Sequence, residues 1–209
     1  MSSKTPNIYK TILWDFDGVI LDSMEIRDSG FEEVLKDFPK ADIQRLLNFH
    51  RKNGGLSRYV KFRYFFEEIR NRKIDEDEVN QWAQKFSAIM LSLLNDPELI
   101  IKDSFQFIKA NYKNHNFHIV SGSDGNELRK ICSALELDNY FLSIEGSPTP
   151  KTKLVDDLIK KYGYDKKSIC LIGDSQNDAD AALKNEIEFF GYNNQDLKSD
   201  YNYIERLFD

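Results

Sequence analysis

The chain has 209 residues, of which 41% are apolar and 31% charged, and its formal net charge at pH 7 is −6. This composition is that of a folded globular protein, and the length suffices for one hydrophobic core plus a modest insertion. The acidic balance argues against a dedicated nucleic-acid-binding protein.

Signals for cross-linking, export or membrane insertion are sparse. Cys132 and Cys170 are too few for a disulfide framework and lack zinc-ligand spacing. The first ten residues hold no apolar stretch of the kind that a secretory signal requires. The longest apolar run, around Ala88 to Leu94, is too short to span a bilayer. We therefore expect a cytoplasmic protein without membrane or nucleic-acid partners, present as a monomer or homodimer.

The first predicted strand, Thr11 to Trp14, leads directly into two carboxylates. Its β-branched and bulky apolar residues are typical of a buried strand. Asp15 and Asp17 are two residues apart, so both can face one side of an extended chain, and Gly18 permits a tight turn. Two close carboxylates repel unless a cation or a shared proton intervenes, which suits a metal, a nucleophile and an acid/base. Taken alone, these residues also fit an ordinary polar turn.

A long middle segment, from about Phe38 to Asn95, has helical periodicity and no convincing strand. A helix that Ser23 can cap precedes it, and Gly54-Gly55 interrupts it. We interpret this segment as part of a helical insertion.

From about Asp103 the pattern changes to helices alternating with short strands. Strands are predicted at 117–121, near 141–144, at 168–172 and at 188–190, and a terminal helix is predicted for 196–209. Such alternation with short connections favours an α/β fold, with a mostly parallel sheet covered on both faces. Ligands of such sheets bind beyond the carboxyl ends of the strands.

Polar residues follow two of these later strands. Ser121 and Gly122 combine a hydroxyl with backbone N–H groups before a helix, which suits phosphate, although an ordinary capped loop is the favoured interpretation of these residues taken alone. Asp174 directly follows a buried strand, and Asp178 lies one helical turn further along. Both can face the same spot, although the helix dipole alone would account for Asp178.

A lysine marks the start of the helix between these two motifs. Lys151 follows Pro148 and Pro150, at a helix N-terminus where the dipole disfavours a cation unless an anion lies nearby. Lys153 is its rival in this segment.

The order of these motifs resembles that of the haloacid dehalogenase superfamily, which contains aspartate-nucleophile phosphatases and related phosphotransferases. DFDGV at 15–19 and GDSQND at 173–178 are the specific parts, with a strand ending in Ser and a Lys between them. The resemblance covers the whole chain and implies a Rossmann-like parallel-sheet core, residues 1–22 and 97–209, with an inserted α-helical cap at 23–96. It also favours Lys151 over Lys153, because Lys151 stands about three turns before Gly163.

The resemblance implies a phosphatase that hydrolyses a small phosphorylated metabolite through an aspartyl-phosphate. Asp15 would be the nucleophile, and Asp17 the acid that protonates the leaving oxygen and then deprotonates water. The phosphoryl oxygens would be bound by Ser121, Gly122 and Lys151.

The same resemblance implies Mg²⁺ as the cofactor. The ion would be held by Asp15, by Asp17 through its backbone carbonyl, and by Asp174. Asp178 would contribute through a water or by orienting Lys151. An acid-rich cluster without His offers the oxygen ligands that Mg²⁺ prefers.

Two other functions remain open. Sugar-phosphate mutases of the β-phosphoglucomutase type share all four motifs but carry a His twelve residues after the nucleophile, where this chain has Arg27. A non-catalytic member that only binds phosphorylated ligands is the third interpretation. Dehalogenation is disfavoured because it needs no acid at the position of Asp17.

The predicted cap contains a basic segment, with eight Lys or Arg and two Glu between Arg51 and Lys73. Most of these side chains suit a solvated helix face. Arg58 differs because it follows the Gly54-Gly55 turn, which could face the core. We expect Arg58 to bind a second anionic group of the substrate, such as a carboxylate or another phosphate.

Overall fold

The computed structural model describes residues 5–208 and contains one six-stranded parallel sheet. Residues 1–4 and 209, which the predicted core ranges include, lie outside the described residues. The strand order is β3-β2-β1-β4-β5-β6. The strands are β1 (Thr11–Trp14), β2 (Asn116–Asp124), β3 (Ser143–Ser147), β4 (Ile169–Gly173), β5 (Glu188–Tyr192) and β6 (Asn202–Ile204).

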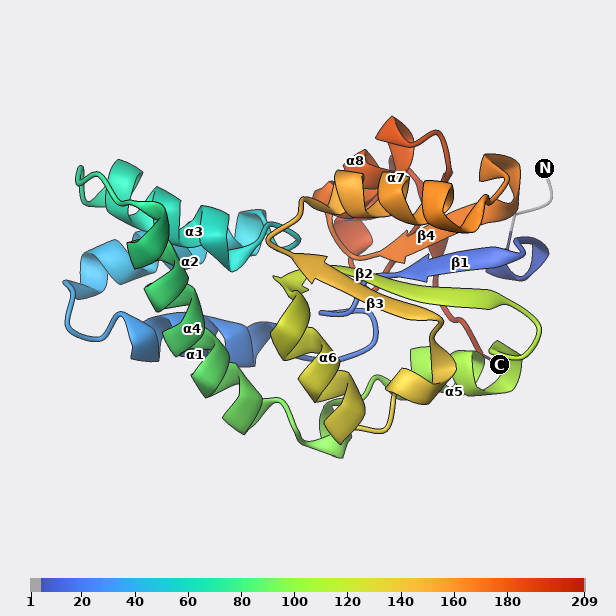
Figure 1. Cartoon of the computed structure of the whole chain (residues 1–209), viewed down its shortest axis with the longest axis horizontal. Helices are drawn as coiled ribbons and strands as arrows, with labels where there is room; N and C mark the ends of the chain where they lie inside the picture. The colour runs from blue at the N-terminus through green and yellow to red at the C-terminus, as the bar shows by residue number, and fades with distance from the viewer. Residues whose placement is uncertain (1–4, 209) are drawn as a thin grey trace.

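Helices cover both faces of this sheet (Figure 1). α5 (Lys102–Asn111) and α6 (Gly125–Ala134) lie on one face, and α7 (Lys151–Tyr162) and α8 (Gln176–Lys184) on the other. Every residue of β1 and of β4 is buried, because a sheet covered on both faces buries alternate side chains on opposite sides. The predicted α/β fold with a parallel sheet is confirmed.

A group of four helices lies beyond the carboxyl ends of the strands (Figure 1). It consists of α1 (Met24–Val34), α2 (Lys40–Lys52), α3 (Arg58–Tyr64), which continues into a π-helical turn at Phe65–Ile69, and α4 (Glu76–Leu93). Aromatic side chains fill its interior: the rings of Phe31 and Phe86 lie 4.4 Å apart, and those of Phe31 and Phe62 lie 5.5 Å apart. No helix in the described part of the chain has the length and hydropathy needed to cross a bilayer.

The two connections between the helical group and the sheet run side by side. Leu21 forms an isolated antiparallel bridge with Ile100. The N–H of Asp22 donates to the carbonyl of Leu99 over 2.8 Å, and that of Ile101 donates to Ile20 over 2.9 Å. The chain therefore leaves and re-enters the sheet region at one hydrogen-bonded place.

Two local predictions are wrong. Instead of a terminal helix, the described residues from 195 onward include a short 3₁₀ turn, Gln195–Leu197, and the edge strand β6. Leu197 and Ile204 are the buried apolar residues of this segment, too few for an amphipathic helix face, whereas β5 offers a free edge for pairing. Ser23 precedes α1, but its hydroxyl makes no cap hydrogen bond and donates to Asp17 instead.

Candidate active site

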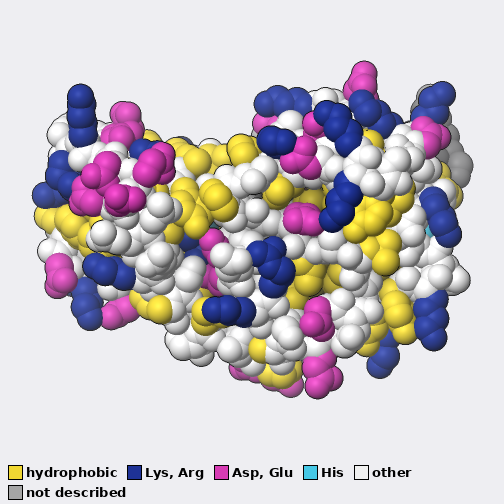
Figure 2. Space-filling model, viewed as in Figure 1, with side chains coloured by type: hydrophobic (Ala, Val, Ile, Leu, Met, Phe, Trp, Pro, Cys, Tyr) yellow, Lys and Arg dark blue, Asp and Glu magenta, His cyan; other side chains and the backbone are white. Residues whose placement is uncertain are grey.

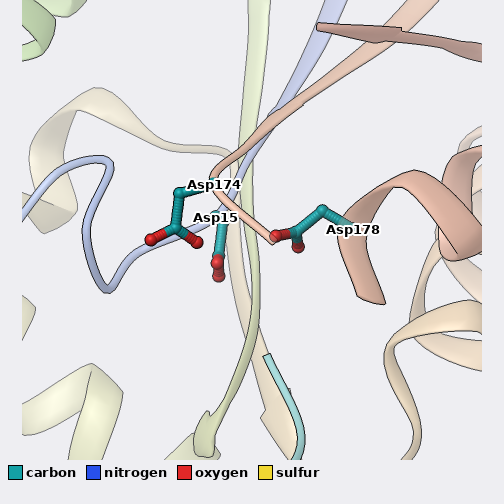
Figure 3. A group of neighbouring side chains, drawn as sticks. All are labelled: Asp15, Asp174 and Asp178. Carbon is teal, nitrogen blue, oxygen red and sulfur yellow. The ribbon is translucent and has the colours of Figure 1, made fainter. Parts of the chain in front are cut away.

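Three carboxylates converge at the carboxyl ends of β1 and β4. Asp15 directly follows β1, Asp174 directly follows β4, and Asp178 lies in the first turn of α8. One oxygen from each lies within 4.8 Å of the others, and the Asp15 carboxylate sits between the other two (Figure 3). Parallel pairing of β1 with β4 places the first two side by side. Asp178 is fixed by a capping box in which its carboxylate accepts from the backbone N–H and the hydroxyl of Ser175.

Lys151 is the cation of this cluster. It is the first residue of α7, it is buried, and its Nζ lies 2.8 Å from Asp15 Oδ1 and also donates to Asp178 Oδ1. Burial lowers the pKa of Lys151, but Asp15 and Asp178 outweigh this effect and raise it above its usual range. Lys153 instead points to the surface, where it pairs with Asp157 over 2.7 Å. The structure thus brings Lys151, and not its rival, to the carboxylates.

The cluster carries a surplus of negative charge. Burial and the neighbouring Asp178 raise the pKa of Asp15 to about 7, and Lys151 opposes this rise only in part. Burial and Asp15 likewise raise the pKa of Asp174. Three carboxylates facing one ammonium group would repel a phosphate dianion unless a cation joined them. The residues present therefore fit Mg²⁺, which prefers oxygen ligands.

The carboxylate of Asp17 is not part of this cluster and accepts hydrogen bonds from three donors. The hydroxyls of Ser23 and Ser123 donate to it over 2.5 and 2.6 Å, and Arg27 Nε donates over 2.6 Å. Burial raises the pKa of Asp17, but the charge of Arg27 and the two hydroxyls outweigh it, so that the pKa falls below its usual value. Neither the role of Ser123 nor the contact with Arg27 was predicted, because neither follows from spacing along the chain.

Ser121 and Gly122 lie within β2, which continues to Asp124 instead of ending at residue 121. Ser121 is buried, and its hydroxyl accepts from the N–H of Ser123. A Cβ on Gly122 would lie 2.2 Å from the carbonyl oxygen of Gly55, so only glycine permits this close approach. Asn177 Nδ2 donates to the same Gly55 oxygen over 2.8 Å. The loop between α2 and α3 therefore rests directly on the strand ends.

The guanidinium group of Arg58 reaches toward the sheet region, where it already forms an ion pair with a carboxylate. Its Nη1 and Nη2 donate to Glu127 of α6 over 2.5 and 2.7 Å, and Nη1 also donates to Ser87 over 2.6 Å. Arg27 Nη1 reaches the same carboxylate over 3.2 Å. Glu127 thus ties α1 and α3 to α6. Glu127 was not predicted as a site residue, because its only signal in the sequence is its place on the buried face of a helix.

A pocket that is partly open to solvent lies between the helical group and the strand ends. The outer surface is hollowed between these two regions (Figure 2). Both parts of the molecule contribute polar side chains to the pocket lining: Asp15, Asp17, Ser121, Ser123 and Asp174 from the strand ends, where the backbone of Gly122 also lines it, and Arg27, His50, Arg58 and Lys61 from the helices. The predicted site residues Asp15, Asp17, Ser121, Gly122, Asp174 and Arg58 therefore share one pocket, whereas Lys151 and Asp178 do not line it.

Replacing Glu127 by Gln should destabilise the protein. Glutamine keeps the shape of the side chain but removes the charge that faces two buried guanidinium groups. Breaking a buried ion pair on one side costs about 3–5 kcal/mol. Urea unfolding measures this cost, and Glu33→Gln, which loses only an exposed pair with Lys36, is the matched control. Equal free energies of unfolding for the two variants would contradict the structural role of Glu127.

Comparison with known proteins places the chain in a family. The family described as haloacid dehalogenase-like hydrolase matches residues 12–192. The chain therefore belongs to the haloacid dehalogenase-like hydrolases, and the expectation drawn from its motifs is confirmed. It is accordingly an enzyme of this hydrolase family. No curated protein matches the sequence.

Several solved structures share the fold over nearly their whole length. A predicted phosphoglycolate phosphatase from Haemophilus somnus is 18% identical, with 95% of each chain covered and a TM-score of 0.72. A predicted phosphatase from Clostridium acetobutylicum is 19% identical, with 94% of this chain and 93% of that chain covered and a TM-score of 0.74. A β-phosphoglucomutase from Clostridium difficile is 16% identical, with 95% and 92% covered and a TM-score of 0.74. At these identities the likeness shows the fold alone.

Proposed function

We propose that the chain is a phosphatase that hydrolyses a small phosphorylated metabolite through an aspartyl-phosphate on Asp15. The observation that carries this proposal is the buried contact of Lys151 with Asp15 inside a cluster of three carboxylates. Phosphoryl transfer depends on positioning and on charge neutralisation more than on covalent chemistry by the protein. The cluster offers a nucleophile, a fixed ammonium group and oxygen ligands for a metal at one place.

In the first half of the proposed reaction, the Asp15 carboxylate attacks phosphorus and the bond to the leaving oxygen breaks. Asp17 donates a proton to that oxygen, which departs as an alcohol. In the second half, Asp17 takes a proton from water, the water oxygen attacks phosphorus, and the bond to Asp15 breaks to release phosphate. Lys151, Ser121 and the N–H groups around Gly122 would bind the phosphoryl oxygens in both halves.

We also propose Mg²⁺ as the cofactor, held by the carboxylates of Asp15 and Asp174 and by the backbone carbonyl of Asp17. A bound Mg²⁺ would supply positive charge to offset the phosphoryl oxygens. Asp178 suits an indirect role, because its two oxygens already accept from Lys151 and Ser175. Its function is then to orient Lys151.

Removing divalent metal ions with a chelator should abolish the hydrolysis of p-nitrophenyl phosphate, and added Mg²⁺ should restore it. Asp174→Asn should weaken Mg²⁺ binding by at least about tenfold, since loss of supporting groups alone typically costs 10–100-fold. Calorimetric titration with Mg²⁺ measures this binding independently of turnover. Asp180→Asn, at an exposed position of α8, is the control and should bind Mg²⁺ like the unmodified chain. Equal activity with and without chelator would count against the metal.

The same assay separates the alternative functions. Release of inorganic phosphate from p-nitrophenyl phosphate supports the phosphatase. Isomerisation of a sugar phosphate without phosphate release would favour a mutase of the β-phosphoglucomutase type. Absence of both reactions would leave a phospho-ligand-binding protein.

We further propose that residues 23–96 act as a cap over a core formed by 1–22 and 97–209, in a cytoplasmic enzyme. The paired connections at Leu21 and Ile100 support this division, because a swing of the cap would change few backbone dihedrals there.

A further inference from the structure

Lys61 is a buried cation in the wall of the pocket. It lies on α3, one turn after Arg58, and is 3% exposed. Its Nζ donates to the carbonyl oxygen of Gly54 over 3.0 Å. Within residues 5–208 no carboxylate lies at ion-pair distance from it. An ammonium group has three N–H donors, so the neutral Gly54 oxygen leaves most of its bonding capacity unused.

The neighbouring arginines differ because acids already neutralise them. Arg58 is paired with Glu127, and Arg27 is shared between Asp17 and Glu127. These two arginines and Lys61 give three cations against the carboxylates of Asp17 and Glu127, and the further acid near Lys61, Asp28, is already paired with Arg51 over 2.8 Å. One positive charge remains without a counter-charge, and it belongs to Lys61.

A buried charge without a partner is costly for the empty protein. Burial and the charge of Arg27 lower the pKa of Lys61 to about 7, and Asp17 offsets only part of this change. Arg27 Nη2 is also buried and has no hydrogen-bond partner among the described residues. Two sets of unsatisfied donors therefore line the same pocket, and an anion entering it would satisfy both.

We propose that Lys61, assisted by Arg27 Nη2, binds a carboxylate at the far end of the phosphorylated substrate. This inference rests on the proposed phosphatase function and narrows the substrate to a short phosphorylated acid. A single carboxylate matches the single surplus charge, whereas a second phosphate would bring two. The role expected of Arg58 passes to Lys61, because Glu127 already neutralises Arg58. Arg58 then serves to hold α3 in place.

Non-hydrolysable phosphonates test this assignment by direct binding. 3-Phosphonopropionate and its carboxamide have the same shape, but only the first carries a carboxylate. Calorimetry in the presence of Mg²⁺ should show that the unmodified chain binds the acid at least about tenfold more tightly, the size expected for a hydrogen bond to a charged group. In Lys61→Met, which keeps the length of the side chain and removes the buried charge, the two affinities should agree within about threefold. The longer pair, 4-phosphonobutyrate and its carboxamide, tests the reach of the site.

The affinity ratio separates binding from a structural role. If Lys61 only held the loop through Gly54, its loss would weaken the acid and the amide alike and leave their ratio unchanged. Lys73→Met, at an exposed position of the same basic segment, should keep the preference for the acid. The inference is overturned if the unmodified chain does not prefer the acid with either pair, or if Lys61→Met retains the preference. Failure to hydrolyse p-nitrophenyl phosphate would instead count against the proposed phosphatase.

Discussion

Asp15→Asn should lower kcat/KM for p-nitrophenyl phosphate by on the order of 10⁴–10⁶, as removal of a nucleophile does in other enzymes. Asparagine has nearly the shape of aspartate but cannot form the acyl phosphate. Asp156→Asn removes an exposed carboxylate that pairs with Lys160, so it serves as the matched control and should keep full activity. Activity of Asp15→Asn within tenfold of the unmodified chain, with unchanged circular dichroism, would refute the nucleophile.

The same variant should be at least as stable as the unmodified chain. The pKa of Asp15 is raised to about 7 from 3.8, so the folded state holds a proton more tightly than the unfolded state does. The contribution of Asp15 to the free energy of unfolding is therefore fully present at low pH and is lost as the pH rises from about 4 to about 7. In the presence of chelator, Asp15→Asn should gain more stability over the unmodified chain at pH 8 than at pH 5. A loss of stability at pH 8 would contradict the repulsion inferred for the carboxylate cluster.

Asp17→Asn should lower turnover by about 10²–10⁴, the usual contribution of general acid/base catalysis. The loss should be larger for an alkyl phosphate than for p-nitrophenyl phosphate, because an alkoxide needs a proton to leave and nitrophenolate does not. Ser123→Ala removes one of the donors to Asp17 and should cause a smaller loss than Asp17→Asn. The assignment is wrong if Asp17→Asn hydrolyses an alkyl phosphate within tenfold of the unmodified rate.

The low pKa of Asp17 determines at which stage of the proposed reaction this side chain is protonated. In the structure Arg27 and two hydroxyls favour the carboxylate, which is the form that accepts a proton from water. The acid form, needed for the leaving oxygen, requires that Arg27 loosen its hold or that the leaving oxygen compete for the same carboxylate. Arg27 therefore occupies a position from which it can influence both halves of the proposed reaction.

Site residues that directly follow a strand could be predicted from the sequence. Asp15 and Asp174 each follow a buried apolar run, and the carboxyl ends of parallel strands meet at one edge of a sheet. The position of Lys151 at the start of a helix, with the dipole against it, also pointed to an anionic neighbour.

Residues defined by contacts between distant elements could not be predicted in this way. Glu127 and Arg58 are 69 residues apart, and neither sequence segment indicates the other. The unpaired charge of Lys61 emerges only once the partners of the arginines around it are known. Strand β6 was missed for the same reason, because an edge strand of three residues depends on the neighbour that it pairs with.

The contact made by Glu127 has a consequence for exchanging parts between relatives. Its carboxylate sits on α6 of the sheet region, while both guanidinium groups that neutralise it arrive on α1 and α3. A chimera that took residues 23–96 from another family member would inherit the carboxylate from one parent and its counter-charges from the other. Unless Arg27, Arg58 and Glu127 all came from the same parent, the chimera would bury an arginine or a glutamate without its counter-charge at the boundary between the two parts. These three residues should therefore be exchanged together in any such chimera.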